Sequence, residues 1–157
     1  MIYCIGIRAK EGAVLNKVIY ITSSVDETEM AGAMLAKTLT EKDPALRFIM
    51  LRGSLGAGKT AFTRGVASVI SPGSRVKSPS YTIVNEYRLG AVPLFHFDLY
   101  RLGEGAGLEG IGFDEYVESG HCIIEWSEYL DDAPQDAITV TITDVGTGRR
   151  KIEIVYP

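Results

Sequence analysis

The sequence predicts an α/β fold: a mixed, mostly parallel sheet flanked by helices, with antiparallel hairpins. Three observations predict it. A nearly continuous apolar run at residues 47–51 leads through a glycine-rich segment into a helical pattern, the strand–loop–helix order of a parallel sheet. A second apolar run, at 121–125, follows another helical pattern. Alternating apolar and polar residues at 138–143 and 150–156 surround Gly146-Thr147-Gly148 and predict a closing hairpin.

Length and composition indicate one globular domain covering residues 1–157. Apolar residues make up 46% of the chain and charged residues 23%, which is ordinary for a folded domain with its own core. Lys and Arg number 16 and Asp and Glu 20, so the net charge of −4 argues against a protein that binds nucleic acid mainly through its phosphates. The two cysteines, Cys4 and Cys122, form no ligand array for zinc.

The sequence contains no signal for membrane insertion. The apolar stretch at 1–7 is too short for the core of a signal peptide. No later apolar run approaches the roughly 20 residues that cross a bilayer. We therefore expect a cytoplasmic protein with reduced thiols and no membrane partner.

The N-terminal part predicts two strands and a helix. Residues 2–7 and 17–21 read as short strands, with 10–16 as their link. Ser24 to Glu27 has capping-box spacing and predicts the start of a helix that Asp43-Pro44 ends. The remaining expected elements are a strand at 47–51, a helix containing 62–70, strands at 81–89 and 92–99 joined at Gly90, a flexible loop at 103–107, a helix at 108–118, and strands at 121–125, 138–143 and 150–156.

Residues 53–60 read Gly-Ser-Leu-Gly-Ala-Gly-Lys-Thr and fit the phosphate-loop pattern Gly-x-x-x-x-Gly-Lys-Ser/Thr. Glycine permits positive φ and lets backbone N–H groups approach phosphates closely. Lys59 would reach the β- and γ-phosphates and act in catalysis, and the Thr60 hydroxyl would hold magnesium. The following helix directs its positive end at the same anion. The sequence thus predicts a site for ATP and Mg²⁺ formed by Gly53, Ser54, Leu55, Gly56, Ala57, Gly58, Lys59, Thr60, Ala61 and Trp126.

A phosphate loop also needs a carboxylate on a neighbouring strand to complete the magnesium shell, usually through water. Asp98 and Glu125 both end apolar runs. The run before Asp98 belongs to the expected hairpin, whereas the run before Glu125 stands alone after a helix, as a parallel strand does. We therefore assign Glu125 to the metal and Asp98 to catalysis, where it would position the attacking water or couple the γ-phosphate to a neighbouring loop. A strand-end Asp98 that bonds Arg101 or a turn is the alternative.

Other residues leave alternatives open. The segment 78–82, Ser-Pro-Ser-Tyr-Thr, suits a switch loop that senses the γ-phosphate, or an ordinary loop entering a strand. His96 and His121 lie in apolar runs and are expected to be core or hydrogen-bonded residues. Trp126 is a core aromatic or lies against the nucleotide.

ATP is favoured over GTP because the one Asn-Lys pair, at 16–17, precedes the loop and lacks the Asp of a guanine motif. Three single arginines could contact phosphate, contact a partner or simply lie on the solvated surface: Arg75, Arg88 and Arg101.

From about residue 23 to the C-terminal hairpin the chain closely resembles the bacterial TsaE (YjeE) family. Many nucleotidases share the phosphate loop, but three further blocks in this order are specific to that family. These blocks are Ser-Pro-Ser-Tyr-Thr-Ile-Val-Asn-Glu-Tyr at 78–87, His-Phe-Asp-Leu-Tyr-Arg at 96–101 and Ile-Glu-Trp-Ser-Glu at 124–128.

The resemblance implies a small ATPase of the P-loop NTPase fold, needed for the N6-threonylcarbamoyladenosine (t6A) modification at position 37 of tRNAs that read codons starting with A. It implies TsaB and TsaD as partners, with TsaD transferring the threonylcarbamoyl group and ATP hydrolysis resetting the complex. tRNA would be contacted only through that complex. On this resemblance Glu125 is the Walker B carboxylate, Asp98 is a switch or catalytic acid, and Trp126 lies beside the site.

The chain departs from the family pattern in three places. Ala61 stands where many members carry a second Thr, so any role for that hydroxyl is absent. Ser80-Tyr81 replaces a common Thr-Phe pair. Residues 1–16 form an N-terminal extension that many members lack.

We therefore predict a P-loop ATPase of the t6A machinery, weakly active alone and stimulated by its partners. One alternative is a small-molecule kinase, but the Arg-rich lid of roughly 20 residues that many such kinases close over their substrate is not found in the sequence. The other is a nucleotide-gated binding module whose turnover is not essential.

Overall fold

The structure, a computed structural model, describes residues 3–6, 17–42, 47–104, 112–131 and 134–157. Five expected features fall wholly or partly outside these residues. They are both ends of the strand at 2–7, the link at 10–16, the helix stop at Asp43-Pro44, most of the loop at 103–107 and the first residues of the helix at 108–118.

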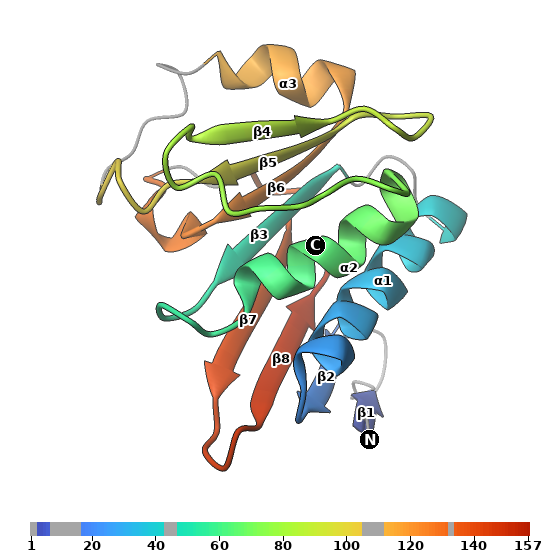
Figure 1. Ribbon diagram of the computed structural model, residues 1–157, viewed down its shortest axis with the longest axis vertical. Helices are drawn as coiled ribbons and strands as arrows, with labels where there is room; N and C mark the ends of the chain where they lie inside the picture. The colour runs from blue at the N-terminus through green and yellow to red at the C-terminus, as the bar shows by residue number, and fades with distance from the viewer. Residues whose placement is uncertain (1–2, 7–16, 43–46, 105–111, 132–133) are drawn as a thin grey trace.

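Within the described residues, eight strands form one sheet in the order β1-β2-β8-β7-β3-β6-β5-β4 (Figure 1). The four central strands, β7, β3, β6 and β5, are parallel. Antiparallel pairs extend the sheet at both edges. The predicted mixed sheet with a mostly parallel core and antiparallel hairpins is confirmed. The strands are β1 Tyr3–Gly6, β2 Lys17–Thr22, β3 Phe48–Arg52, β4 Val84–Tyr87, β5 Leu94–Asp98, β6 His121–Glu125, β7 Ile138–Asp144 and β8 Arg150–Val155.

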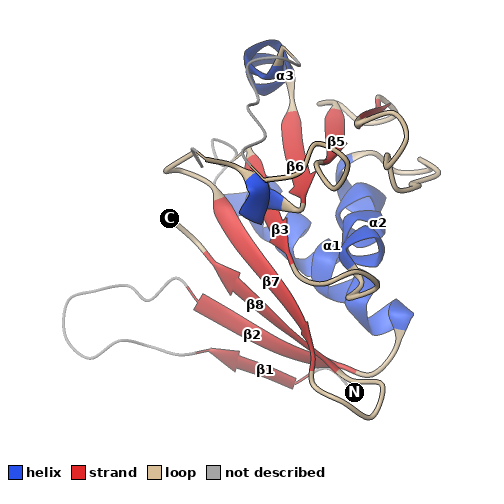
Figure 2. Ribbon diagram, turned by 90° about the vertical axis from the view of Figure 1, so that its left-hand side faces the viewer, coloured by secondary structure: helices blue, strands red, loops and turns tan. Residues whose placement is uncertain are grey.

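Helices flank the sheet as expected. Helices α1 (Val25–Lys42) and α2 (Lys59–Ile70) lie side by side on one face, and the short α3 (Phe113–Ser119) packs near β5 and β6 (Figures 1 and 2). Side-chain alternation along β3 separates two cores. Ile49 and Leu51 belong to the core that includes α1 and α2, whereas Phe48 and Met50 belong to the core that includes Phe113 of α3.

The two long helices approach each other through glycines. A Cβ at Gly65 of α2 would lie 1.8 Å from the carbonyl oxygen of Glu29, and one at Gly32 of α1 would lie 2.2 Å from that of Phe62. Side chains at these positions would force the helices apart. Because α1 and the sheet hold α2 in place, the N-terminal end of α2 is fixed beside the carboxyl ends of the central strands.

Helix α1 begins where the capping pattern predicts. The Ser24 hydroxyl accepts a hydrogen bond from the N–H of Glu27 at 3.1 Å. The Glu27 carboxylate reaches back to the N–H of Ser23, at 2.7 Å, instead of to that of Ser24.

The expected strand at 81–89 is wrong at both ends, because β4 begins only at Val84 and ends at Tyr87. Residues before it form a turn in which the N–H groups of Thr82 and Ile83 both donate to the carbonyl of Pro79, at 3.0 and 2.8 Å. Ile83 has φ of 68°, a left-handed conformation that ends a strand and is strained for a β-branched residue.

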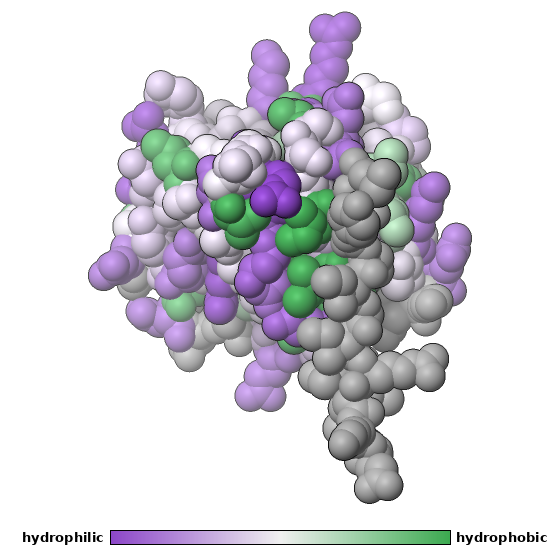
Figure 3. Space-filling view, turned by 90° about the horizontal axis from the view of Figure 1, so that it is seen from below, coloured by the Kyte–Doolittle hydropathy of each residue, from purple (hydrophilic) through white to green (hydrophobic). Residues whose placement is uncertain are grey.

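The surface carries scattered apolar side chains. Figure 3 shows a face on which hydrophobic residues stand among hydrophilic ones. A search of the described helices finds none whose length and apolar character suit a bilayer-spanning segment.

Candidate functional site

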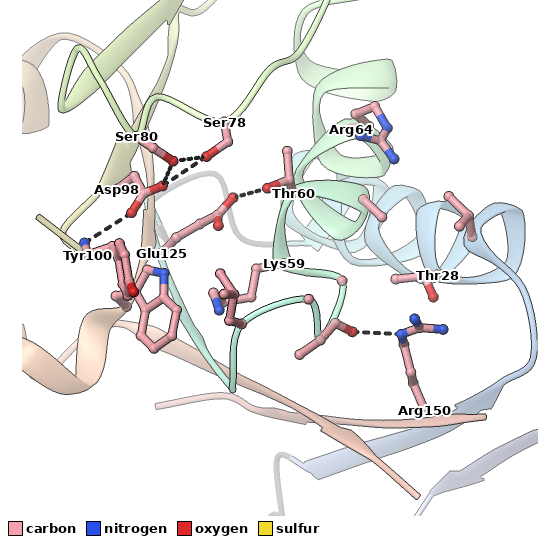
Figure 4. Close-up of a pocket in the computed structure, with 17 residues that line it drawn as sticks. Thr28, Lys59, Thr60, Arg64, Ser78, Ser80, Asp98, Tyr100, Glu125 and Arg150 are labelled. Atoms are coloured by element: carbon pink, nitrogen blue, oxygen red, sulfur yellow. Dashed lines mark hydrogen bonds between the residues drawn. The ribbon is translucent and has the colours of Figure 1, made fainter. Parts of the chain in front are cut away.

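A pocket of about 400 Å³ lies at the carboxyl ends of β3, β5 and β6, beside the start of α2 (Figure 4). Of the residues predicted for the site, 55–61, Asp98, Glu125 and Trp126 line the pocket. Gly53 and Ser54 belong to the same loop and contact the Lys59 side chain. The fold thus brings side chains from three strands, β5, β6 and β8, and from both long helices, α1 and α2, to one place.

Glycines shape the loop between β3 and α2. Gly53, Gly56 and Gly58 have φ of 144°, 75° and 113°, values that residues with a side chain rarely adopt. At Gly53 a Cβ would also lie 2.4 Å from the carbonyl oxygen of Ile142 on β7. Gly58 caps α2, so the unbonded N–H groups of the first helical turn point toward the pocket. Such a helix end favours an anion.

Lys59 is folded back onto its own loop. Its Nζ donates to the carbonyl oxygens of Gly53, at 2.6 Å, and Ser54, at 3.0 Å. Nζ also lies 3.8 Å from the centre of the Trp126 ring, a cation–π contact. Burial lowers the pKa of the Lys59 ammonium, and the nearby carboxylate of Glu125 opposes that shift. Phosphate oxygens would give this ammonium stronger partners than two carbonyls.

Thr60 and Glu125 meet across the gap between α2 and β6. The Thr60 hydroxyl donates to Glu125 Oε1 at 2.9 Å. A hydroxyl and a carboxylate are hard oxygen donors and suit Mg²⁺, which takes most of its other ligands from phosphates and water. The pair therefore fits a magnesium ion bound together with a nucleotide. Among the described residues, no group of three or more His, Cys, Asp and Glu side chains has the arrangement of a metal centre.

Asp98 holds the segment before β4. Its Oδ2 accepts hydrogen bonds from the hydroxyls of Ser78, at 2.9 Å, and Ser80, at 2.8 Å. Its Oδ1 accepts the N–H of Tyr100 at 3.0 Å. Asp98 and Glu125 are direct neighbours in the parallel register of β5 and β6. The carboxylate therefore ties the Ser78–Ser80 segment to the pocket. Of the alternative contacts considered from the sequence, the bond to a turn is present, at the Tyr100 N–H, whereas no hydrogen bond or ion pair to Arg101 is among the described contacts of Asp98.

The histidines are both buried, as expected, but only one has a described partner. His96 Nε2 lies 2.8 Å from Glu125 Oε1. His121 is at the far end of the parallel strands, and its Nδ1 has no partner among the described residues. Burial and the nearby Arg47 lower the pKa of His121.

Sequence reasoning missed the arginines of the pocket. Arg150 on β8 donates from Nε to the carbonyl oxygen of Ala57 at 2.8 Å, and Arg64 on α2 pairs with Glu29. The position of Arg150 follows from β8 lying next to β7 and β7 next to β3, an order that the sequence does not contain. The arginines singled out from the sequence lie elsewhere: Arg88 bonds Glu86, Arg101 stacks on Tyr81, and Arg75 is not among the pocket residues.

The glycine loop between a parallel strand and a helix, with a neighbouring strand that ends in a carboxylate, defines a protein of the P-loop NTPase fold. The chain belongs to the TsaE family: the family model described as "Threonylcarbamoyl adenosine biosynthesis protein TsaE" matches residues 22–152. The resemblance to the TsaE family seen in the sequence is thereby confirmed.

Named relatives and a solved structure agree with this assignment. The tRNA threonylcarbamoyladenosine biosynthesis protein TsaE of Bacillus subtilis strain 168 is 39% identical over 106 residues, 66% of each chain. The Haemophilus influenzae protein of the same name is 39% identical over 123 residues, 78% of this chain and 76% of its own length. The crystal structure of Bacillus subtilis YdiB has a TM-score of 0.69 at 29% identity, covering 92% of this chain and 88% of that one.

Proposed function

We propose that this chain is the ATP-binding and ATP-hydrolysing subunit required for t6A modification of tRNA, and that it acts on the TsaB–TsaD complex. One observation carries the proposal. In a chain whose residues 22–152 match the TsaE family, the phosphate loop, the Thr60–Glu125 pair and Asp98 line a single pocket. We also propose that residues 1–157 act as one domain, in which 1–16 are an N-terminal extension, and that tRNA is reached only through the complex.

The pocket supports a division of roles among its residues. Lys59 and the loop N–H groups would hold the phosphates, with Trp126 beside the nucleotide. Arg150, fixed by its bond to Ala57, would add a second positive charge at the same place. Thr60 would hold Mg²⁺ directly and Glu125 through water. The bound ion would neutralise phosphate charge, which is the main requirement of phosphoryl transfer.

Asp98 is proposed to act on the γ-phosphate side of the site. Its carboxylate is fixed by three donors and lies beside Glu125, so it can orient a water molecule or transmit the presence of the γ-phosphate to Ser78 and Ser80. These three donors already occupy most of the positions at which the carboxylate could accept a proton or a bond from the attacking water. Slow hydrolysis by the isolated chain, accelerated by partners, is the expected consequence.

The test is phosphate release from Mg-ATP without any acceptor, measured for the chain alone and with the TsaB–TsaD pair, while t6A formation is followed in the same reactions. We expect slow release that the pair increases, and loss of both activities in Lys59→Ala. Transfer of the phosphate to an added hydroxyl acceptor would favour a kinase instead.

The binding-module alternative requires a separate comparison. Asp98→Ala should still bind the TsaB–TsaD pair in an ATP-dependent pull-down but should lose hydrolysis and t6A formation. Retained t6A formation without hydrolysis would show that nucleotide binding alone suffices and would contradict the enzyme.

A further inference from the structure

A histidine in the centre of the sheet contacts the carboxylate that faces the pocket. His96 on β5 is 0% exposed, and its Nε2 lies 2.8 Å from Glu125 Oε1 on β6. Along β5, His96 and Asp98 point to the same face, because side chains of a strand alternate. His96 therefore lies directly beneath the row of pocket residues, out of reach of any nucleotide.

The hydrogen bonds define which nitrogen carries the proton. A carboxylate oxygen accepts and does not donate, so the N–H must be on His96 Nε2. The other nitrogen, Nδ1, is buried and has no partner among the described residues. With the proton on Nε2, Nδ1 is left as an acceptor without a partner there.

Glu125 Oε1 is therefore held from two sides. His96 donates to it from the sheet, and the Thr60 hydroxyl donates to it from α2. The second oxygen, Oε2, accepts no hydrogen bond in the part of the chain that the structure describes, and Glu125 lines the pocket. Two donors on one oxygen fix the plane of the carboxylate, so that Oε2 remains available to the pocket.

We propose that His96 is a positioning residue of the nucleotide site: it holds Glu125 by Oε1 so that Oε2 is directed at the water shell of the magnesium ion. This inference rests on the proposed function and deepens it. Such partners of metal-site residues fix the orientation of the ligand, and losing one typically costs about 10- to 100-fold in metal affinity.

A merely structural role for His96 predicts different behaviour, and two variants separate the roles. In His96→Gln the side-chain amide nitrogen has a reach similar to that of Nε2 and keeps a donor. In His96→Leu a side chain of similar size fills the core but has no donor. Thermal unfolding shows whether each variant folds.

The first measurement is the affinity for ADP by calorimetry, with EDTA and with Mg²⁺. We expect His96→Leu to reduce the gain in affinity from Mg²⁺ by about tenfold while metal-free affinity stays within about twofold. His96→Gln should retain most of the gain. An unchanged gain in His96→Leu, or an equal loss of affinity with and without Mg²⁺, would overturn the inference.

The second measurement needs no nucleotide and no variant. Long-range ¹H–¹⁵N NMR spectra of the wild-type protein should show the His96 ring protonated on Nε2 and bare at Nδ1. A proton on Nδ1 with a bare Nε2 would overturn the inference alone, because Nε2 could then not donate to Glu125. Wild-type protein that binds no nucleotide would instead overturn the proposed function, so the two failures are distinguishable.

Discussion

The pocket edge of the sheet and the β7–β8 hairpin bury different kinds of side chains. At the pocket edge, four ionisable residues are almost completely buried: Lys59, His96, Asp98 and Glu125. In β7 and β8 the buried side chains are apolar, and the charged residues of this hairpin stay on partly exposed positions. Even when paired, buried ionisable groups often stabilise a fold less than well-packed apolar side chains of similar volume, so the pocket edge does not maximise stability. Apolar core positions, in contrast, favour the folded state directly.

Because the two regions bury different side chains, we expect stability and activity to respond to different substitutions. Changes at the buried apolar positions of the β7–β8 hairpin should alter the free energy of unfolding and leave nucleotide binding intact in the folded protein. Arg150, the hairpin residue that lines the pocket, is excepted. Changes at the pocket edge should alter nucleotide chemistry with little change in stability. Four substitutions test this separation.

Ile152→Ala should have the largest effect. Ile152 on β8 is 0% exposed, and truncating a fully buried Ile costs about 2–5 kcal/mol of the free energy of unfolding. Urea unfolding measures the loss, and calorimetry on the folded variant should give unchanged ADP affinity. Val155→Ala on the same strand, 42% exposed, is the matched control and should cost less than about 0.5 kcal/mol. Equal losses of unfolding free energy in the two variants would show that burial of Ile152 does not stabilise the hairpin.

Asp98→Asn should affect turnover instead. The amide keeps the size of the carboxylate but lacks its charge, so ATP hydrolysis in the presence of partners should fall by about 100-fold or more. Unfolding free energy should change by less than about 1 kcal/mol, because the amide oxygen can still accept the Tyr100 N–H and the Ser78 and Ser80 hydroxyls can rotate to accept from the amide NH₂. Phosphate-release rates and urea unfolding are the measurements. Wild-type turnover in this variant would exclude a catalytic or switch role for Asp98.

Thr147→Asn should stabilise the protein modestly. Thr147, in the turn between β7 and β8, has φ of 55°, a conformation that Asn tolerates and β-branched residues do not. The expected gain is about 1 kcal/mol in thermal or urea unfolding. Thr141→Asn, in the middle of β7, is the control and should destabilise because Asn is a poor strand residue. A gain at both positions would mean that backbone strain is not the cause.

Glu153→Gln should have the smallest effect and should depend on pH. Contacts with Lys151 and Lys17 lower the pKa of the Glu153 carboxyl from its ordinary 4.5. The stabilisation is therefore present above the ordinary pKa and is lost as pH falls through the lowered one. We expect wild type to exceed the variant by about 0.5 kcal/mol at neutral pH and low salt, and to equal it in acid. A difference that grows on acidification would have the wrong sign.

Local patterns made much of the fold predictable. The signals for the strand–glycine loop–helix segment at 47–70 and for the hairpin around Gly146-Thr147-Gly148 lie in a few neighbouring residues of the sequence. The structure has the expected strands and helix at both places. The start of β4 could not be predicted. The left-handed conformation of Ile83 accompanies a turn in which the N–H groups of Thr82 and Ile83 donate to the Pro79 carbonyl, and residue preferences for strands do not predict such a turn.

The candidate site was accessible from sequence only where strand ends mark it. Asp98 and Glu125 stand at such ends and are neighbours in the sheet. His96 also carried a signal, since it is two residues before Asp98 and thus on the same face. Arg150 carried none, because its contact with Ala57 depends on the order of β8, β7 and β3 in the sheet.

A crystal structure with Mg²⁺ and a non-hydrolysable ATP analogue would show directly whether the loop binds the nucleotide. We expect phosphates bound to the N–H groups between Gly53 and Thr60, with Lys59 Nζ moved from the carbonyl oxygens of Gly53 and Ser54 to phosphate oxygens. We also expect a magnesium ion next to Thr60. A nucleotide bound elsewhere, with this loop empty and Lys59 still on its own carbonyls, would contradict the proposed nucleotide site.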